Sequence, residues 1–285
     1  MFTLDTAVIA AEVKKAIVAV SRNMEPSCLA ALEKARNAET SSAAKFALEK
    51  MCENARFAAA KGYPVCQDTG MCVVFAEIGK DVMLTGELLQ KAVDAAVAEG
   101  YADLRKSVLD PVTRVNTGTN APAVLHTDIV EGSEVKVGVM LKGFGSENMS
   151  AIYMLNPAQG LDAAKDLIVD TVRRAGSNPC PPVIVGVGLG GTFELCAKLS
   201  KQALFRKIGS SNPDPLLNGM EKELLGRINS LGIGAQGFGG AATALGVFIR
   251  KYPTHISSLP VAVNILCHCS RAQVAVISRE GVRYE

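Results

Sequence analysis

The stretch Tyr63-Pro64-Val65-Cys66-Gln67-Asp68-Thr69-Gly70 leads directly into Met71–Gly79, and the rest of the chain is organised around these two segments. The second segment is rich in β-branched and aromatic residues and ends at a glycine, which predicts a strand. Cys66 and Asp68 therefore lie on a loop that enters a strand. A thiolate and a carboxylate so placed could serve one bound molecule as metal ligand and proton donor. A structural cysteine beside a turn-forming aspartate is the commoner explanation of such a pair taken alone, so other segments must decide.

Composition is typical of a soluble globular protein. Of the 285 residues, 48% are apolar and 20% charged, which suffices for a large core. The 30 basic residues balance 28 acidic ones and aromatic residues make up only 5%, so we expect no nucleic-acid surface. The N-terminus lacks a signal-peptide pattern and no apolar run approaches about 18 residues, so we expect a cytoplasmic protein without a membrane span.

Eight cysteines are spread along the chain. They are Cys28, Cys52, Cys66, Cys72, Cys180, Cys196, Cys267 and Cys269. In a reducing compartment such residues are more often thiols or ligands than disulfides. None forms a Cys-x-x-Cys pair, which excludes zinc ribbons and the spacing of bacterial ferredoxins.

Hydrophobic periodicity predicts an α/β protein. Helical spacing of apolar residues indicates helices across residues 3–61. Thr85 is a plausible N-cap for a helix that ends at Gly100, and alternation over 124–130 and 135–140 predicts a β-hairpin. Further helices are expected over 163–175 and 215–231, with strands over 183–187, 244–249 and 259–266. We therefore expect one domain over 1–285, with a helical layer at 1–61 and an α/β part at 62–285 that has a mixed β-sheet and packed helices.

Two glycine-rich segments could contact an anion. Gly186, Gly188 and Gly191 follow a predicted strand and precede a helix, as in a dinucleotide site, but no acidic residue ends a following strand. Close packing of strand and helix explains the same glycines. The segment 142–148 has Gly143 and Gly145, whose backbone N–H groups could bind an anion or could belong to an ordinary turn.

Cys66, Cys180 and Cys267 each lie in a loop beside a predicted strand, a repeated setting that a purely structural role does not explain. The chain resembles the α subunit of the two-subunit class I fumarate hydratases, which are iron–sulfur hydro-lyases, with the L-tartrate dehydratase α subunit as a sibling. The matching stretches are 66–70, 116–118 with 120–123, 145–148, 178–182 with 186–192, and 252–255 through 267–268. They span nearly the whole chain in family order. The segments 145–148 and 264–268 look more like the fumarate hydratases.

This resemblance implies a [4Fe–4S] cluster and the fold of the class I fumarase N-terminal domain. The implied ligands are Cys66, Cys180 and Cys267, which leave one iron without a protein ligand, able to act as a Lewis acid. Cys269 stands two residues from Cys267, and spacing cannot reject it as the third ligand. The remaining cysteines lie in helix or strand patterns, and we expect them in the core.

The resemblance also implies reversible hydration of fumarate to L-malate. Its implied substrate-contacting residues are Gln67, Asp68, Arg105, Gly143, Gly145 and His255, of which Gln67, Asp68 and His255 are the catalytic candidates. Asp68 would move a proton at the departing or arriving hydroxyl, and Gln67 would hydrogen-bond a substrate carboxylate. Arg105 would bind a carboxylate through its planar guanidinium, although Lys106 is a neighbouring cation.

A β subunit is the implied partner, in a hetero-oligomer of α2β2 type. Anti elimination needs a base on the face opposite the hydroxyl, and a dicarboxylate needs more cations than Arg105 alone. Without its partner the chain could self-associate through an apolar surface. Two departures from the family pattern, Phe144 and Ala272, concern substrate choice.

Three other functions stay open at this point. The first is that of the L-tartrate dehydratase α subunit. The second is a nucleotide-binding oxidoreductase that uses the Gly186 loop. The third is a non-catalytic iron–sulfur scaffold, which would hold a cluster without turnover.

Overall fold

Strand β2 (Met71–Gly79) forms directly after the Cys66 loop and is almost wholly buried. The backbone N–H and C=O groups of a buried strand need partners on both edges. Strand β2 pairs in parallel with β4 (Val124–Val130) and antiparallel with β5 (Val135–Lys142). The predicted β-hairpin of β4 and β5 is therefore wrong, because β2 lies between them in the sheet. Alternation identified both strands but not their partners.

The structure, a computed structural model, describes residues 2–285 and divides the chain into two units. Unit 1 comprises Met1–Glu25, Phe57–Phe144 and Arg271–Glu285, and unit 2 comprises Pro26–Arg56 and Gly145–Ser270. The helices expected across residues 3–61 form as α1 (Thr6–Arg22), α2 (Pro26–Ala38) and α3 (Ser42–Lys61). Helix α1 belongs to unit 1, α2 belongs to unit 2, and α3 runs from unit 2 into unit 1. That residues 1–61 form one helical layer of a single domain stays a prediction. That all of 1–285 serves one cluster-bearing function stays a prediction.

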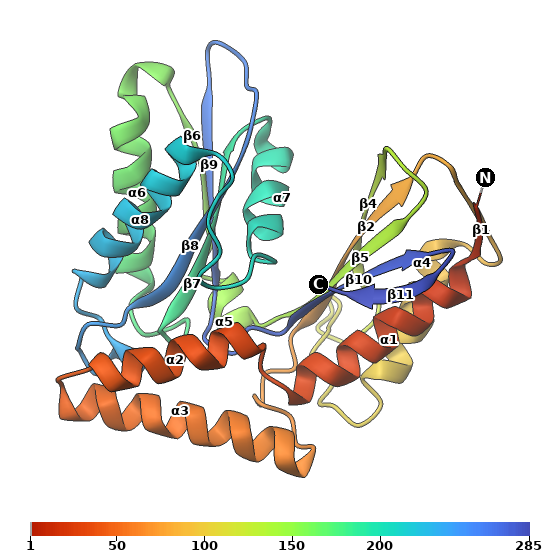
Figure 1. Ribbon diagram of the computed structural model, residues 1–285, viewed down its shortest axis with the longest axis horizontal. Helices are drawn as coiled ribbons and strands as arrows, with labels where there is room; N and C mark the ends of the chain where they lie inside the picture. The colour runs from red at the N-terminus through yellow and green to blue at the C-terminus, as the bar shows by residue number, and fades with distance from the viewer. Residues whose placement is uncertain (1) are drawn as a thin grey trace. The chain divides into compact units, whose positions relative to one another are not determined.

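Unit 1 is a five-stranded sheet with two helices packed on it. The strand order is β11-β10-β5-β2-β4, with β10 (Ala272–Ser278) and β11 (Gly281–Tyr284) absent from the expected elements. Helix α1 packs beside α4 (Leu89–Gly100) (Figure 1). Gly100 lets the Ile17 side chain approach, because a Cβ there would lie 3.1 Å from Ile17 Cβ.

A second, two-stranded sheet in unit 1 corrects two boundaries. Strand β1 (Phe2–Asp5) pairs in parallel with β3 (Val82–Thr85), and Asp5 lies opposite Thr85. Residues 3–5 are thus strand, where helix was expected. Thr85 belongs to this ladder and does not cap α4, which begins at Leu89 without a side-chain cap.

Unit 2 is a four-stranded sheet covered on both faces. The order β6-β9-β7-β8 joins β6 (Ala151–Leu155), β9 (Leu259–Leu266), β7 (Val183–Gly190) and β8 (Ala244–Tyr252). Helices α6 (Gly160–Ala175) and α8 (Pro215–Asn229) cover one face and α7 (Phe193–Ala203) the other (Figure 1). The short helices are α5 (Phe144–Glu147), η1 (Pro157–Gln159) and η2 (Ala235–Gly237).

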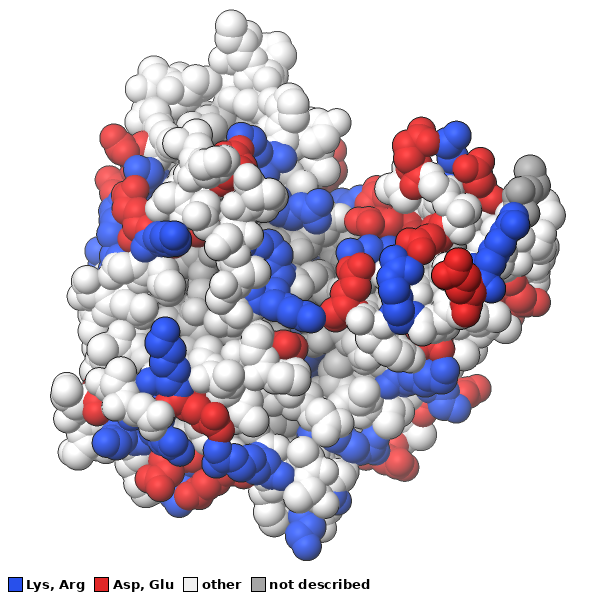
Figure 2. Space-filling model, viewed as in Figure 1, with Lys and Arg blue, Asp and Glu red and all other residues white. Residues whose placement is uncertain are grey.

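Figure 2 shows Lys and Arg intermingled with Asp and Glu over the visible face, without a broad patch of one sign. Among residues 2–285, no helix combines the length and the apolar character that crossing a membrane requires.

The close contact of β7 and α7 depends on glycine. A Cβ at Gly188 would stand 2.1 Å from the Cys196 carbonyl oxygen. We expect Gly188→Ala to lower the free energy of unfolding by about 1–3 kcal/mol, the usual cost of overpacking. Urea denaturation followed by circular dichroism measures this.

The control is Gly219→Ala on α8, where no atom lies within 4 Å of the added Cβ. It should stabilise the protein by about 0.5–1 kcal/mol because alanine loses less entropy in a helix. Equal stability of the Gly188→Ala variant and the wild type would contradict the packing account.

Candidate active site

The Cys66 loop in unit 1 is held at both ends by backbone contacts. The Val65 N–H donates to the Ser21 carbonyl oxygen at 2.9 Å, which ties the loop to the end of α1. Gly70 has φ +70°, and a Cβ there would stand 2.8 Å from the Lys142 carbonyl oxygen. A glycine is therefore required where the loop enters β2. Cys66 is half-buried and Gln67 exposed on this fixed loop.

The Asp68 carboxylate is fixed through both of its oxygens. Oδ1 accepts the Gly70 N–H at 2.9 Å and Oδ2 accepts the Phe144 N–H at 2.8 Å. Charge-assisted bonds of this kind orient a carboxylate firmly. Phe144 thus uses its N–H on Asp68, so part of the turn expected to bind an external anion already binds a side chain.

Gly143 and Arg271 complete the surroundings of Asp68. A Cβ at Gly143 would lie 3.0 Å from Asp68 Oδ2 and 3.1 Å from Arg271 Nη2. Arg271 is only 2% exposed and donates from Nη1 to the Asp68 carbonyl oxygen, while its Nε has no hydrogen-bond partner among the described residues. This role of Arg271 was not predicted from the sequence, in which the start of β10 at Ala272 is the one neighbouring signal.

Arg105 lies beside this loop. Its carbonyl oxygen accepts the Thr69 hydroxyl at 2.8 Å and the Asn120 amide at 2.9 Å. Its side chain is exposed, whereas Lys106 donates from Nζ to the carbonyl oxygens of Tyr101, Ala102 and Leu104 at the end of α4. Lys106 thus has a structural role, which favours Arg105 as the substrate-binding cation. Unit 1 brings together Cys66, Gln67, Asp68, Arg105 and Gly143.

Cys180 and Cys267 lie on neighbouring loops of unit 2. Cys180 precedes β7 and Cys267 follows β9, and these strands pair antiparallel with Ile184 opposite Leu266. The two loops are joined by His268, whose Nδ1 lies 2.9 Å from the Cys180 carbonyl oxygen. Gly145 lies near the same loop, because a Cβ there would stand 3.4 Å from the Asn178 carbonyl oxygen.

His255 lies near the opposite end of the strands of the same sheet. Tyr252 pairs with Gly190 at the end of β7, and the turn that carries His255 follows Tyr252 (Figure 1). Cys180 and Cys267 adjoin the other end of β7, about 25 Å away at roughly 3.3 Å per residue. His255 instead has Nδ1 2.7 Å from Ser257 Oγ. Unit 2 does not bring His255 to its two cysteines, so the expected substrate contact stays a prediction that this unit does not support.

Burial separates the loop cysteines from the others. Cys28, Cys52, Cys72 and Cys196 are fully buried, as expected for core residues, and burial raises the pKa of Cys72 to about 12 and of Cys196 to about 11. Cys269 is 4% exposed, whereas Cys267 is half-buried and Cys180 exposed. A ligand thiol must be within reach of the group that it binds, so accessibility favours Cys267 over Cys269. None of the eight cysteines, all within the described residues, forms a disulfide.

The chemistry of the three loop cysteines suits an iron–sulfur group. Over residues 2–285, neither unit by itself brings together three His, Cys, Asp or Glu side chains as a metal site. Unit 1 contributes the half-buried Cys66, and unit 2 contributes two thiols on loops joined by His268. Thiolates are the usual ligands of iron–sulfur clusters, so these residues fit the group in kind.

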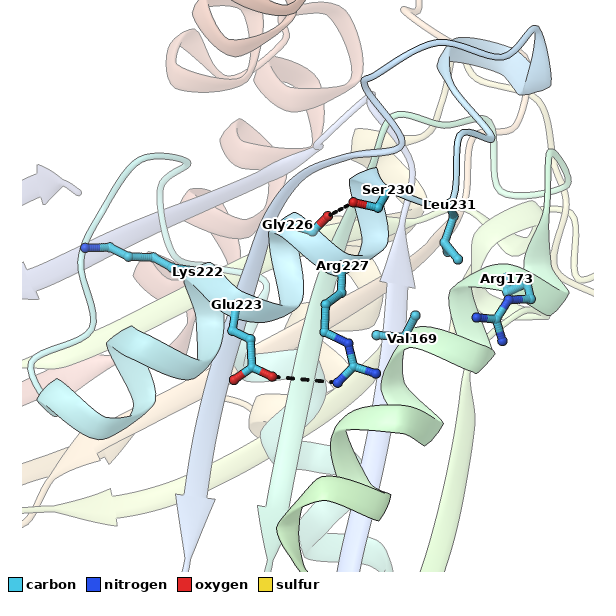
Figure 3. Close-up of a pocket in the computed structure, with 8 residues that line it drawn as sticks. All are labelled: Val169, Arg173, Lys222, Glu223, Gly226, Arg227, Ser230 and Leu231. Carbon is cyan, nitrogen blue, oxygen red and sulfur yellow. Dashed lines mark hydrogen bonds and ion pairs between the residues drawn. The ribbon is translucent and has the colours of Figure 1, made fainter.

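Neither the glycine-rich segment at Gly186 nor the hollow between α6 and α8 belongs to the candidate active site. A Cβ at Gly186 would lie 2.1 Å from the Ser200 carbonyl oxygen of α7, so close packing accounts for the glycine pattern without a nucleotide. Figure 3 shows a hollow between α6 and α8 that is bordered by charged side chains, among them Arg227, 3.7 Å from Glu223. None of the predicted site residues lines it.

The family model and the relatives that match this chain all point to one family of proteins. A family model described as Fumarate hydratase (Fumerase) matches residues 10–276. A protein of Methanocaldococcus jannaschii, provisionally named L(+)-tartrate dehydratase subunit alpha, is 42% identical over 88% of this chain and 91% of its own length. The L(+)-tartrate dehydratase subunit alpha of Escherichia coli K12 is 33% identical over 88% of this chain and 85% of its own.

Burial predicts the order in which the thiols react. In reduced, metal-free protein at about pH 8, iodoacetamide should modify Cys66, Cys180 and Cys267 well before Cys72 and Cys196, because only thiolates react and a raised pKa keeps a thiol protonated. Peptide mass spectrometry over time measures each rate. Modification of Cys269 as fast as Cys267 would contradict the preference for Cys267.

Proposed function

Because the chain belongs to the Fumarate hydratase (Fumerase) family of hydro-lyases, we propose that it is the cluster-carrying α subunit of a two-subunit enzyme that reversibly hydrates fumarate to L-malate. In this proposal its fold is that of the class I fumarase N-terminal domain. The observation that carries the proposal is the Asp68 carboxylate, fixed by two backbone N–H groups and next but one to a half-buried thiol.

The proposed ligands of the [4Fe–4S] cluster are Cys66 of unit 1 with Cys180 and Cys267 of unit 2. A cluster with three thiolate ligands supplies a Lewis-acidic iron with an open position, which makes hydroxide a better leaving group. The accessibility of the three loop thiols supports this choice, as does the protonation of the buried Cys72 and Cys196.

The chain's own side chains bind the substrate and move a proton. Asp68 delivers or accepts the proton at the departing or arriving hydroxyl. Each of its oxygens accepts one backbone N–H and has a second lone pair with which to bind that proton. Gln67 hydrogen-bonds one substrate carboxylate. Arg105, exposed beside the loop, binds a carboxylate with two parallel bonds. Gly143 and Gly145 remain candidates for backbone contacts to the other carboxylate.

A β subunit supplies what this chain lacks in our proposal. Anti elimination requires a base on the face of the substrate opposite the leaving hydroxyl, and the second carboxylate requires further cations. The relatives from M. jannaschii and E. coli are themselves named alpha subunits, which supports a partner for this chain.

L(+)-tartrate dehydration is the second candidate, because both of these relatives carry that name. Tartrate also has two carboxylates and a leaving hydroxyl, so Asp68, Gln67 and Arg105 would have the same roles. It has an additional hydroxyl on the carbon that loses the proton, and this group would need a further polar partner.

The role of Asp68 is testable by substitution. Asp68→Asn should keep the cluster and lower kcat by about 100-fold or more, the scale of a lost general acid or base. Iron analysis and steady-state kinetics of the two-subunit enzyme measure both. Wild-type turnover in this variant would remove Asp68 from proton transfer.

Arg105→Ala should chiefly raise the KM, because it removes binding of a carboxylate. Lys106→Met is the matched control: it should lower the melting temperature, since it removes three bonds to carbonyl oxygens, and leave the KM unchanged. The opposite pattern would assign the substrate to Lys106.

The proposal as a whole is tested by assaying fumarate, L-malate and L(+)-tartrate with anaerobically reconstituted protein, with and without its β subunit. We expect fumarate hydration only when both subunits are present. Turnover of tartrate alone would favour the second candidate. Full turnover without a β subunit would place the base in this chain, and a loaded pair without turnover would support a scaffold.

A further inference from the structure

We propose that His268 is a positioning residue that ties the Cys267 loop to the Cys180 loop and so presents the two thiols together. The inference rests on the proposed function, because it takes both thiols as cluster ligands. It concerns unit 2 alone, in which all of the residues involved lie.

The imidazole of His268 reaches directly across to the neighbouring loop. Nδ1 lies 2.9 Å from the Cys180 carbonyl oxygen. A carbonyl oxygen can only accept, so Nδ1 carries the proton of this bond. His268 follows Cys267 in the chain, and therefore one side chain joins the backbone of one ligand to the residue next to the other.

His268 is itself anchored from the core. Its own carbonyl oxygen accepts the thiol of Cys28 at 2.9 Å, and Cys28 is fully buried on α2. The backbone of His268 is therefore fixed to α2 while its ring extends to the Cys180 loop. A side chain held in this way can transmit the position of one loop to the other.

Cys180 needs such support because of its backbone conformation. Its φ of +55° lies in the left-handed region that non-glycine residues rarely adopt and that persists only where neighbours hold it. On one side the Cys180 N–H donates to the Ser177 carbonyl oxygen at 3.0 Å. On the other side the Pro181 carbonyl oxygen accepts the backbone N–H of Gln236 at 2.8 Å and its side-chain amide at 3.1 Å. Of these bonds, only that of His268 leads to the Cys267 loop.

The imidazole ring of His268 is not part of the hydrophobic core. His268 is half-buried and lies at the edge of an open groove with Phe46, Met51 and Phe238. Removal of a ring at an open groove leaves space that water can enter, and not a sealed core cavity. We therefore expect substitutions here to change the coupling of the loops more than the stability of the fold.

Three variants isolate the hydrogen bond. The amide N–H of His268→Asn stands close to where Nδ1 was and can still donate. His268→Asp has the same shape but presents an acceptor to the Cys180 carbonyl oxygen, and His268→Ala removes the group. The first readout is the rate at which iodoacetamide modifies Cys180 in metal-free protein, relative to Cys66 in the same sample. The second is the rate at which a chelator removes iron from reconstituted protein.

We expect His268→Ala and His268→Asp to raise both rates by about 2- to 10-fold, the range expected for one lost hydrogen bond, and His268→Asn to stay near the wild type. Wild-type rates in His268→Ala would overturn the proposal, and so would rates in His268→Asn that match those of His268→Ala. The wild type and the three variants should have the same melting temperature. A lower melting temperature in His268→Ala and His268→Asp alone would mean that His268 stabilises the fold and does not position the loops. If the proposed function fails, wild-type protein takes up no cluster, whereas the alkylation rates still test His268.

Discussion

The register of the ladder formed by β10, β5 and β2 determines where the chemical groups of unit 1 lie. Met71 at the start of β2 pairs with Lys142 at the end of β5, so the residues before the one and after the other meet at one edge of the sheet. Asp68 consequently reaches the Phe144 N–H. Because Ala272 pairs with Met140, the same edge receives Arg271. A shift by one residue would turn every side chain to the other face and separate these groups.

Much of this architecture could be predicted from periodicity, but the partners of the elements could not. Strand β9 begins and ends as expected, and α1, α6 and α8 lie where apolar spacing indicated. The hairpin of β4 and β5 was wrong because alternation reports which face is buried and carries no information on which strand lies alongside. Strands β10 and β11 were missed because neither alternates between buried and exposed residues: β10 buries three consecutive residues, and all four residues of β11 are exposed.

In the candidate site, too, the residues could be predicted from the sequence but their contacts could not. Motif resemblance identified the residues of unit 1 that the structure groups around Asp68, and packing then distinguished Arg105 from Lys106 through the three carbonyl oxygens that hold the lysine. Arg271 and His268 escaped sequence reasoning because both act through hydrogen bonds to backbone carbonyl oxygens, which leave no residue pattern. His255 matched a motif, yet in unit 2 it lies at the end of the strands opposite to Cys180 and Cys267. A sequence motif does not specify which residues of neighbouring strands lie side by side.

The central proposal is that Cys66, Cys180 and Cys267 are the three ligands of one cluster. It is tested most directly by iron and sulfide analysis of anaerobically reconstituted single variants, Cys66→Ser, Cys180→Ser and Cys267→Ser, with Cys269→Ser as the matched control for the buried neighbour. The account predicts about four iron and four sulfide per chain in the wild type and in Cys269→Ser, the composition of a cubane cluster, and loss of the cluster in each of the other three. A full cluster in Cys66→Ser, or loss in Cys269→Ser with retention in Cys267→Ser, would contradict it.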